Sequence, residues 1–254
     1  TPAMRPRNSS DRRRASSREE SDRLPAVTFA VNIGQVIVAL ARRCRALFLV
    51  LTVLLPTVVA LAPGAAAQSC PQAELIFARG RIEPAGAGQI GSALISALRQ
   101  KTGMDIDLYS VNYPADTEID IGANDMSRRI QYMMDNCPDT RLVLGGYSLG
   151  AAVTDVVLAV PIAAFGFRNP LPAGADRHIA AVALFGNGIA WVGPISNFNP
   201  LYSDRTIELC HGDDPICNPT DPENWQDYWA DHLAPAYINA GMVNQAADFV
   251  AGRL

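Results

Sequence analysis

A single serine lies between two glycines at the end of an apolar run, where its hydroxyl could act as a nucleophile. The run is LVLGGYSLGAAV, residues 142–153, and Ser148 lies two residues from both Gly146 and Gly150. A G-x-S-x-G pattern places a serine on a sharp turn between a strand and a helix, where N–H groups favour developing negative charge. Alone, the pattern occurs by chance in roughly one protein of this size in ten. The alternative is a capping serine in a tight turn, but the strand-like run before it and the helical pattern after it favour a nucleophile.

The base for such a serine has to come from one of three histidines, His178, His211 and His232. A serine hydroxyl is a poor nucleophile until a base takes its proton. His178 opens an expected strand, and His211 follows another strand in a loop between two cysteines. His232 lies in the long loop before the last helix. In proteins that use this turn for catalysis, the chain order is serine, acid, histidine. This order selects His232.

The acid is expected in the segment CHGDDPIC, residues 210–217, which holds Asp213 and Asp214. Cys210 and Cys217 are seven residues apart, close enough for a disulfide that would clamp this small loop. Repulsion between the neighbouring carboxylates would raise the pKa of one of them. The alternative is an ordinary solvated turn. Spacing alone does not choose between the two aspartates.

Cysteine usage favours disulfides over a metal site. Cys44 precedes residue 67, and four cysteines follow it: Cys70, Cys137, Cys210 and Cys217. An even number in an exported chain implies disulfides, and three pairings are possible. No C-x-x-C pair exists, and the histidines do not have a usual zinc spacing. We therefore expect neither a metal ion nor a cofactor.

The first 67 residues differ in composition from the rest. Residues 5–23 hold seven arginines among serines and acids without apolar periodicity, which is typical of a disordered segment. Three arginines within 42–45 then precede an apolar stretch at 46–62, and 65–67 form an A-x-A cleavage site. This is the pattern of a secretory signal, and a transmembrane anchor is the alternative.

We predict three parts. Residues 1–40 are a disordered leader or a mis-set start, 41–67 a secretory signal peptide, and 68–254 the folded domain. The whole chain has a net charge of −4, whereas residues 68–254 hold 11 basic and 21 acidic residues, a net charge of −10. This balance argues against nucleic acid or an anionic membrane held by charge. It suits a protein that is secreted or located in the cell envelope.

Strands and helices are expected to alternate along the folded domain. Short apolar runs predict five strands, at 73–80, 105–114, 141–147, 178–188 and 205–210. Helical spacing predicts helices at 88–103, 119–138, 149–166 (ended by Pro161) and 235–254. Alternation indicates parallel βαβ units, and continuous apolar runs indicate helices on both sheet faces. We expect a three-layer α/β/α sandwich with a mostly parallel five-stranded central sheet. Its functional loops follow the carboxyl ends of the strands.

Three blocks of the chain resemble the cutinase family, small secreted serine esterases of the α/β-hydrolase class, over residues 70–254. The nucleophile block reads CPDTRLVLGGYSLGA, residues 137–151. In the acid block, the family's catalytic aspartate is fourth after the first cysteine, which maps onto Asp214. The base block places a histidine shortly before the last helix, which maps onto His232. The resemblance implies a small lidless α/β-hydrolase fold. It also implies a disulfide between Cys70 and Cys137.

The same resemblance implies an oxyanion hole made by two backbone N–H groups. One belongs to Leu149, where most members carry glutamine. The other belongs to Arg81, in the loop ARGRIEPAG, residues 78–86, where the family has a serine. The serine hydroxyl is lost, and losing one such donor can cost about 10²–10³ in rate. We expect the Arg81 guanidinium to lie near the oxyanion or near an acidic substrate.

The loop before His232 carries three aromatic residues, Trp225, Tyr228 and Trp229. Aromatic side chains serve both in packed loops and at lipid surfaces. A packed loop and a lipid-facing flap therefore both stay open.

Together, these features imply a secreted serine esterase that hydrolyses carboxylic esters through Ser148, His232 and Asp214 and an acyl-enzyme. The expected substrate is an ester of a lipid, a polyester or an acylated glycan. We expect a monomer in transient contact with a lipid surface. An acetylxylan-type carbohydrate esterase or an acyltransferase with the same triad is one alternative. A catalytically impaired cell-envelope binding protein is another, motivated by Arg81 and Leu149.

Overall fold

The computed structural model describes residues 69–254, and the predicted leader and signal peptide lie outside the described residues. Five strands form one sheet in the order β2-β1-β3-β4-β5, and every neighbouring pair is parallel. The strands are β1 (Ala73–Ala78), β2 (Ile106–Ser110), β3 (Arg141–Tyr147), β4 (Ile179–Phe185) and β5 (Thr206–Leu209). Each lies within one of the five predicted runs, so the predicted α/β class with a five-stranded sheet is confirmed.

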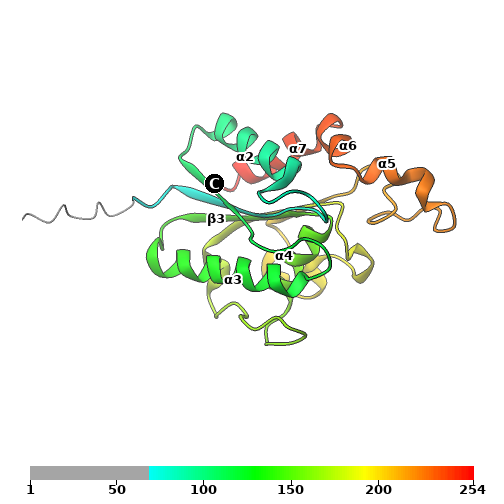
Figure 1. The fold of residues 1–254 in the computed structure, drawn as a ribbon. Helices are drawn as coiled ribbons and strands as arrows, with labels where there is room; N and C mark the ends of the chain where they lie inside the picture. Colours follow the sequence, from blue (N-terminus) through cyan, green and yellow to red (C-terminus); the bar gives the residue numbers. More distant parts are fainter. Residues whose placement is uncertain (1–68) are drawn as a thin grey trace, which may run out of the picture. The chain divides into compact units, whose positions relative to one another are not determined.

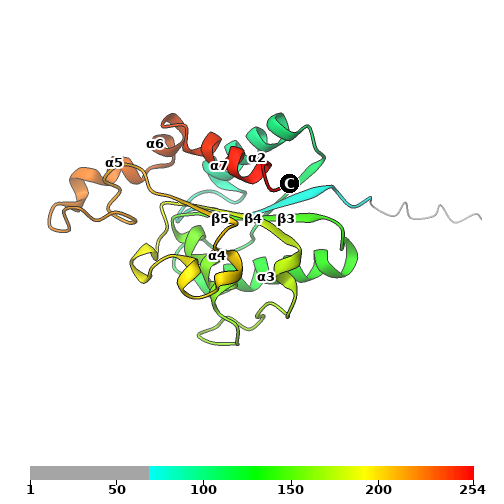
Figure 2. The same ribbon diagram turned by 180° about the vertical axis from the view of Figure 1, so that it is seen from behind.

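Helices cover both faces of this sheet (Figures 1 and 2). The helices are α2 (Gly88–Thr102), α3 (Ile119–Asn136), α4 (Leu149–Ala159), α5 (Trp229–His232), α6 (Ala234–Asn239) and α7 (Met242–Ala251). Figure 1 shows α2, α6 and α7 on one face and α3 and α4 on the other. Each face buries its own apolar cluster, which explains why β1 is buried along its whole length. The expected three-layer sandwich is therefore present.

The prediction of a single closing helix at 235–254 is wrong, because two helices occupy this range. Helix α6 ends at Asn239 and α7 begins at Met242. Between them Gly241 adopts a left-handed conformation with φ of 76°. A residue without a Cβ adopts this conformation at little cost, so the chain can turn here and start a new helix.

Two disulfides are present among the described residues. Cys70 and Cys137 join the chain before β1 to the end of α3, with their Cα atoms 5.5 Å apart. Cys210 and Cys217 close the loop after β5, with their Cα atoms 5.8 Å apart. In residues 69–254, none of the helices combines the length and hydropathy that crossing a bilayer requires.

The order of the strands fixes where a site can form. Strand β1 lies between β2 and β3, so the chain leaves β1 and β3 toward opposite faces of the sheet. Such a switch point opens a crevice at the carboxyl ends of the two strands. The loop after β1 and the turn after β3 meet there.

Candidate active site

Ser148 occupies the turn between β3 and α4 in a strained backbone conformation. Its φ is 56° and its ψ is −117°, a region that residues with a side chain rarely adopt. Backbone hydrogen bonds hold it there. Its N–H donates to the carbonyl oxygen of Phe185 at 2.9 Å, and its own carbonyl oxygen accepts from the N–H of Gly188 at 3.1 Å. The hydroxyl is thereby fixed at the first turn of α4.

The turn depends on close backbone approaches at the two glycines of the motif. A Cβ on Gly146 would lie 2.1 Å from the carbonyl oxygen of Gly150. A Cβ on Gly150 would lie 2.0 Å from the carbonyl oxygen of Ala78, at the end of β1. Neither distance is compatible with a side chain, so the G-x-S-x-G spacing is a steric requirement of this turn.

The structure brings Ser148, His232 and Asp214 together from three loops. The Oγ of Ser148 lies 2.8 Å from Nε2 of His232, and Nδ1 of His232 lies 2.7 Å from Oδ2 of Asp214. Asp214 is fully buried, and His232 is 4% exposed. The imidazole can therefore accept the serine proton on one side while the carboxylate orients it on the other.

Asp214 is held as a carboxylate by several donors. Burial alone would raise its pKa, but hydrogen bonds from His232 and Tyr237 outweigh burial and hold the pKa of Asp214 below its ordinary value. The N–H of Ile216 also donates to Oδ1, at 2.8 Å. Asp213 is exposed, and its N–H donates to Asp231. The expected rise in pKa from like-charge repulsion is therefore wrong for Asp214.

Two aromatic residues hold the imidazole, and the sequence did not single them out for this role. The hydroxyl of Tyr147, next to the serine, donates to the carbonyl oxygen of His232, and the two rings stack with centroids 5.5 Å apart. The ring of Trp229 also contacts that of His232, with the two centroids 5.0 Å apart. Tyr147 stands inside the G-x-S-x-G motif, which is the signal that could have identified it.

The other two histidines lie elsewhere. Nδ1 of His211 is 3.4 Å from a carboxylate oxygen of Asp231. Nδ1 of His178 is 3.1 Å from the carbonyl oxygen of Pro138, at the opposite edge of the sheet. Neither is hydrogen-bonded to the serine.

Both expected oxyanion donors line the cavity beside Ser148. Leu149 is the first residue of α4, where N–H groups have no partner within the helix. In the loop after β1, the N–H groups of Gly80, Ile82 and Glu83 each have an acceptor, whereas that of Arg81 has none within residues 69–254. The backbone thus keeps a donor available at Arg81.

The guanidinium of Arg81 is paired with the carboxylate of Asp116. Its Nη2 lies 2.9 Å and its Nε 3.1 Å from Oδ1 of Asp116. Both side chains are about 60% exposed. We expected this guanidinium to lie near the oxyanion or near an acidic substrate. In the structure it is paired with Asp116, and its place relative to a bound substrate stays a prediction.

A buried arginine and a glutamate shape this loop, and the sequence did not reveal them. Nε of Arg79 donates to the carbonyl oxygen of Glu83 at 2.8 Å, and Nη2 donates to that of Tyr113 at 2.7 Å. The Glu83 carboxylate accepts from the N–H groups of Gly80 at 2.7 Å and Gln89 at 2.9 Å. The four-residue spacing of Arg79 and Glu83 in ARGRIEP is the sequence feature from which this contact could have been predicted.

A second buried pair braces the chain behind the serine. Nδ2 of Asn187 donates to Oδ2 of Asp155 in α4 at 2.6 Å, and its Oδ1 accepts from the N–H of Ile189 at 3.1 Å. Burial raises the pKa of Asp155 to about 7. This pair ties α4 to the loop whose Gly188 bonds to Ser148.

A cavity of about 800 Å³ opens beside the serine. Ser148 and His232 line it, together with the apolar side chains of Ile82, Trp229 and Leu233. These three side chains are also partly or largely exposed. The arrangement offers an apolar surface next to a polar reaction centre.

The aromatic segment before His232 projects from the sandwich (Figure 1). Trp225 and Trp229 are 42% and 39% exposed, and their rings contact each other with centroids 5.6 Å apart. The structure packs Trp229 on the imidazole and leaves part of both indoles in solvent.

The acid loop brings two cysteine sulfurs and a carboxylate together, an arrangement that also occurs at metal sites. Ligand atoms of Cys210, Asp214 and Cys217 lie within 4.8 Å of one another. The two sulfurs are joined in a disulfide, so they are not thiolate ligands, and Asp214 faces His232.

Comparisons with known proteins agree with this geometry. The Cutinase family model matches residues 69–254. The probable carboxylesterase Culp2 of Mycobacterium tuberculosis (strain ATCC 25618 / H37Rv) is 66% identical over 195 residues, which are 77% of this chain and 84% of that protein. The phospholipase Culp4 of the same strain is 50% identical over 199 residues, which are likewise 77% of this chain and 84% of that protein.

A solved structure shows the same relationship. The cutinase of Trichoderma reesei, in complex with a C11Y4 phosphonate inhibitor, is 27% identical with a TM-score of 0.55, and the match covers 72% of this chain and 76% of that one. The chain therefore belongs to the cutinase family and is a carboxylic ester hydrolase with the α/β-hydrolase fold.

Proposed function

We propose that this protein is a secreted serine esterase in which Ser148 is the nucleophile, His232 the general base and Asp214 the residue that orients the imidazole. The continuous hydrogen-bond chain from Oγ of Ser148 to Oδ2 of Asp214 carries this proposal. It joins three residue types in the geometry that activates a hydroxyl.

The reaction proceeds in two halves. Oγ of Ser148 attacks the ester carbonyl while Nε2 of His232 takes its proton. The N–H groups of Leu149 and Arg81 hold the oxyanion that forms. His232 then gives the proton to the leaving alcohol, and an acyl-enzyme remains. Water attacks the acyl-enzyme with His232 again acting as base, which releases the acid and restores the serine hydroxyl.

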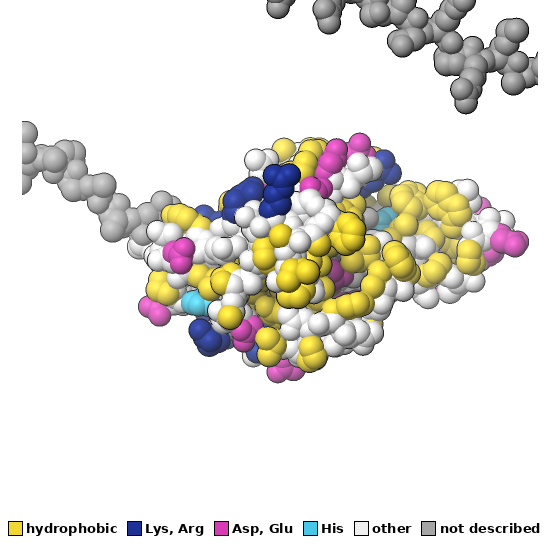
Figure 3. Space-filling model, turned by 90° about the horizontal axis from the view of Figure 1, so that it is seen from below, with side chains coloured by type: hydrophobic (Ala, Val, Ile, Leu, Met, Phe, Trp, Pro, Cys, Tyr) yellow, Lys and Arg dark blue, Asp and Glu magenta, His cyan; other side chains and the backbone are white. Residues whose placement is uncertain are grey.

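We further propose that the acyl part of the substrate is an apolar chain, as in a lipid or a polyester. The apolar side chains beside Ser148 support this choice over an acetyl group, which needs little apolar surface. Figure 3 shows hydrophobic side chains gathered on the projecting segment that carries Trp225 and Trp229. These exposed indoles support transient contact of a monomer with a lipid surface. The signal-like sequence at 41–67 and the two disulfides support export.

The role of Ser148 is tested by replacing it with alanine. Ser148→Ala should lower hydrolysis of p-nitrophenyl butyrate by at least about 10³-fold, because only the oxyanion donors and binding remain. A fluorophosphonate probe should label the wild-type chain at Ser148 and leave the variant unlabelled. Unchanged turnover in the variant, or an unreactive wild type, would falsify the proposal.

The substrate class is tested with a series of p-nitrophenyl esters from acetate to palmitate. We expect kcat/KM to rise from acetate to esters of medium chain length. Maximal activity on the acetate ester, together with release of acetate from acetylated xylan, would favour the carbohydrate esterase instead.

A further inference from the structure

Four arginines line one cavity at the amino-terminal edge of the sheet. The cavity has a volume of about 310 Å³. Arg141 begins β3, Arg177 and Arg205 lie just before β4 and β5, and Arg253 follows α7. Ser148 follows the other end of β3, so the length of a strand, about 20 Å, separates this cavity from the candidate active site.

The charge of this cavity differs from that of the domain around it. Residues 69–254 hold 11 Lys and Arg against 21 Asp and Glu. Four of these 11 cations line one cavity, where only Asp139 and Asp204 supply carboxylates. A local excess of positive charge on an acidic domain attracts anions.

Backbone oxygens fix two of these guanidinium groups. Nη1 of Arg205 donates to the carbonyl oxygens of Asp176 at 2.8 Å and Ile179 at 3.0 Å. Nη2 of Arg253 donates to the carbonyl oxygen of Asp204 at 2.7 Å. Carbonyl oxygens are neutral, so they orient the guanidinium groups without cancelling their charge. The ion pair of Arg205 with the carboxylate of Asp204 is long, at 3.7 Å, and that carboxylate is largely exposed.

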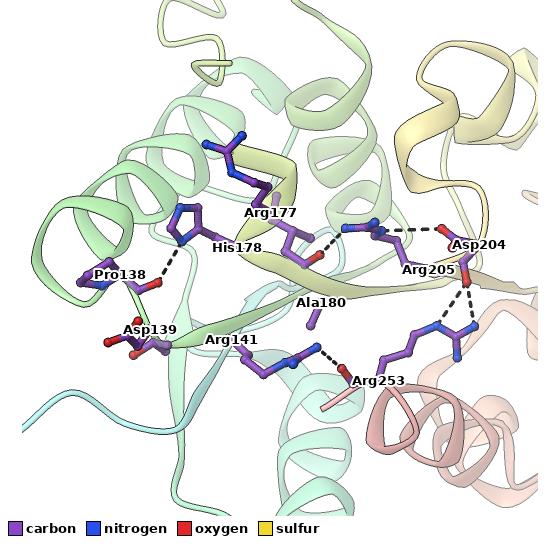
Figure 4. Close-up of a pocket in the computed structure, with 11 residues that line it drawn as sticks. Pro138, Asp139, Arg141, Arg177, His178, Ala180, Asp204, Arg205 and Arg253 are labelled. Atoms are coloured by element: carbon purple, nitrogen blue, oxygen red, sulfur yellow. Dashed lines mark hydrogen bonds and ion pairs between the residues drawn. The ribbon is translucent and has the colours of Figure 1, made fainter. Parts of the chain in front are cut away.

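Arg141, Arg205 and Arg253 line the cavity together with the small side chain of Ala180. Figure 4 shows Arg141 beside Ala180, whereas the guanidinium groups of Arg205 and Arg253 are both directed toward Asp204. One of the five N–H donors of Arg141 is used in a hydrogen bond to the carbonyl oxygen of Arg253. The guanidinium of Arg177 points away from the other three (Figure 4).

We propose that this cavity binds a phosphate group, as inorganic phosphate or as a phosphomonoester, between Arg141, Arg205 and Arg253. A guanidinium presents two parallel N–H donors to a pair of oxygens, and phosphate is the recurrent partner of this geometry. Arg141 keeps most of its donors, and Arg205 keeps its Nη2 group. Arg253 already donates from Nε and Nη2 to the carbonyl oxygen of Asp204 and from Nη1 to that of Phe249, so it contributes mainly its charge. Three positive charges suit a phosphate dianion better than a singly charged carboxylate. The cavity opens to solvent at the sheet edge, so it also admits the group that carries the phosphate.

The proposal is tested on the full chain by calorimetric titration with inorganic phosphate in chloride buffer at constant ionic strength. We expect one binding event per chain. Arg141→Gln should weaken it about tenfold, since a hydrogen bond to a charged group is lost. Arg168→Gln is the matched control, because Arg168 is exposed and does not line the cavity. Both variants should hydrolyse p-nitrophenyl butyrate at the wild-type rate, which shows that they are folded.

Two further probes distinguish the source of the phosphate. Vesicles that contain phosphatidic acid should retain the wild-type chain more than phosphatidylcholine vesicles do, if the phosphate belongs to a lipid headgroup, and Arg141→Gln should abolish the difference. If Arg141→Gln weakens phosphate binding but the phosphatidic acid vesicles do not retain the wild-type chain more strongly, the ligand of the cavity is a soluble phosphate. The proposal is overturned if the wild type binds neither probe, or if Arg141→Gln and Arg168→Gln bind them equally.

Discussion

Tyr237 and His232 donate to the same oxygen of Asp214. The hydroxyl of Tyr237 lies 2.5 Å from Oδ2, and Nδ1 of His232 lies 2.7 Å from it. Burial and the neighbouring carboxylate raise the pKa of Tyr237, so its hydroxyl stays a donor. The carboxylate is thereby kept charged inside the protein, where an unpaired charge would be unfavourable.

Tyr237→Phe should lower kcat by about tenfold, because the carboxylate loses a charge-assisted donor and its pKa rises. The pKa of Asp214 is lowered by folding, so its contribution to stability is present above about pH 4 and is lost as the pH falls further. In the variant this contribution is smaller, and its loss is complete at a higher pH. Ester hydrolysis at neutral pH and urea denaturation between pH 3 and pH 7 measure the two effects.

The control is Tyr202→Phe, which removes another buried hydroxyl that lies outside the active-site cavity. It should leave kcat unchanged. Equal activity of the two variants would contradict the role of Tyr237.

Arg81→Ser should raise kcat by about tenfold or more, because it returns a hydroxyl to the oxyanion loop. Arg81→Ala should leave kcat within about twofold of the wild type. The guanidinium is paired with Asp116 at an exposed position, and the proposed donor is the backbone N–H. Steady-state kinetics with p-nitrophenyl butyrate measure both. A large loss in Arg81→Ala would show that the guanidinium itself takes part.

Gly150→Ala should destabilise the protein by about 3 kcal/mol or more, because the new Cβ would collide with backbone at the end of β1. Gly252→Ala is the matched control, since the nearest atom to its Cβ would be 3.6 Å away. Thermal denaturation of both variants measures the difference. Similar melting temperatures would mean that the turn after β3 adapts more easily than its geometry indicates.

The two disulfides should contribute differently to stability and to activity. In a chain-entropy estimate, removing Cys70–Cys137 costs about 4 kcal/mol of stability and removing Cys210–Cys217 about 2 kcal/mol. Replacing Cys210 and Cys217 by serine should nevertheless lower kcat more, because that loop holds Asp214. Denaturation and ester hydrolysis of the two double variants test this, and the reverse order of kcat values would refute it.

Asp155→Asn should become more stable relative to the wild type as the pH rises from about 4 to 8. Burial raises the pKa of Asp155 to about 7, so folding favours its neutral form and the wild type loses stability as the pH rises through this range. An asparagine stays neutral and can still accept from Asn187. The gain is at most about 4 kcal/mol, and urea denaturation at pH 4.5 and pH 8 measures it. A difference that does not change with pH would contradict this.

The sheet was predictable because parallel strands buried on both faces leave continuous apolar runs, as in LVLGGY before Ser148. Chain order likewise selected His232. Spacing did not choose between Asp213 and Asp214, because adjacent residues differ only in where the folded loop directs them. The hydrogen bonds from Tyr237 to Asp214 and from Arg79 to Tyr113 were not visible, because they join residues distant in sequence.

The strained turn at Ser148 has a consequence for the evolution of this chain. A glycine at position 148 would adopt the observed φ and ψ without a steric penalty, which for other residues is about 1–3 kcal/mol. Part of that relief would be offset by the greater freedom of glycine in the unfolded chain. On the proposed mechanism, Ser148→Gly is inactive, and we expect it to be more stable than the wild type. Selection for the proposed nucleophile would then retain the less stable of the two residues.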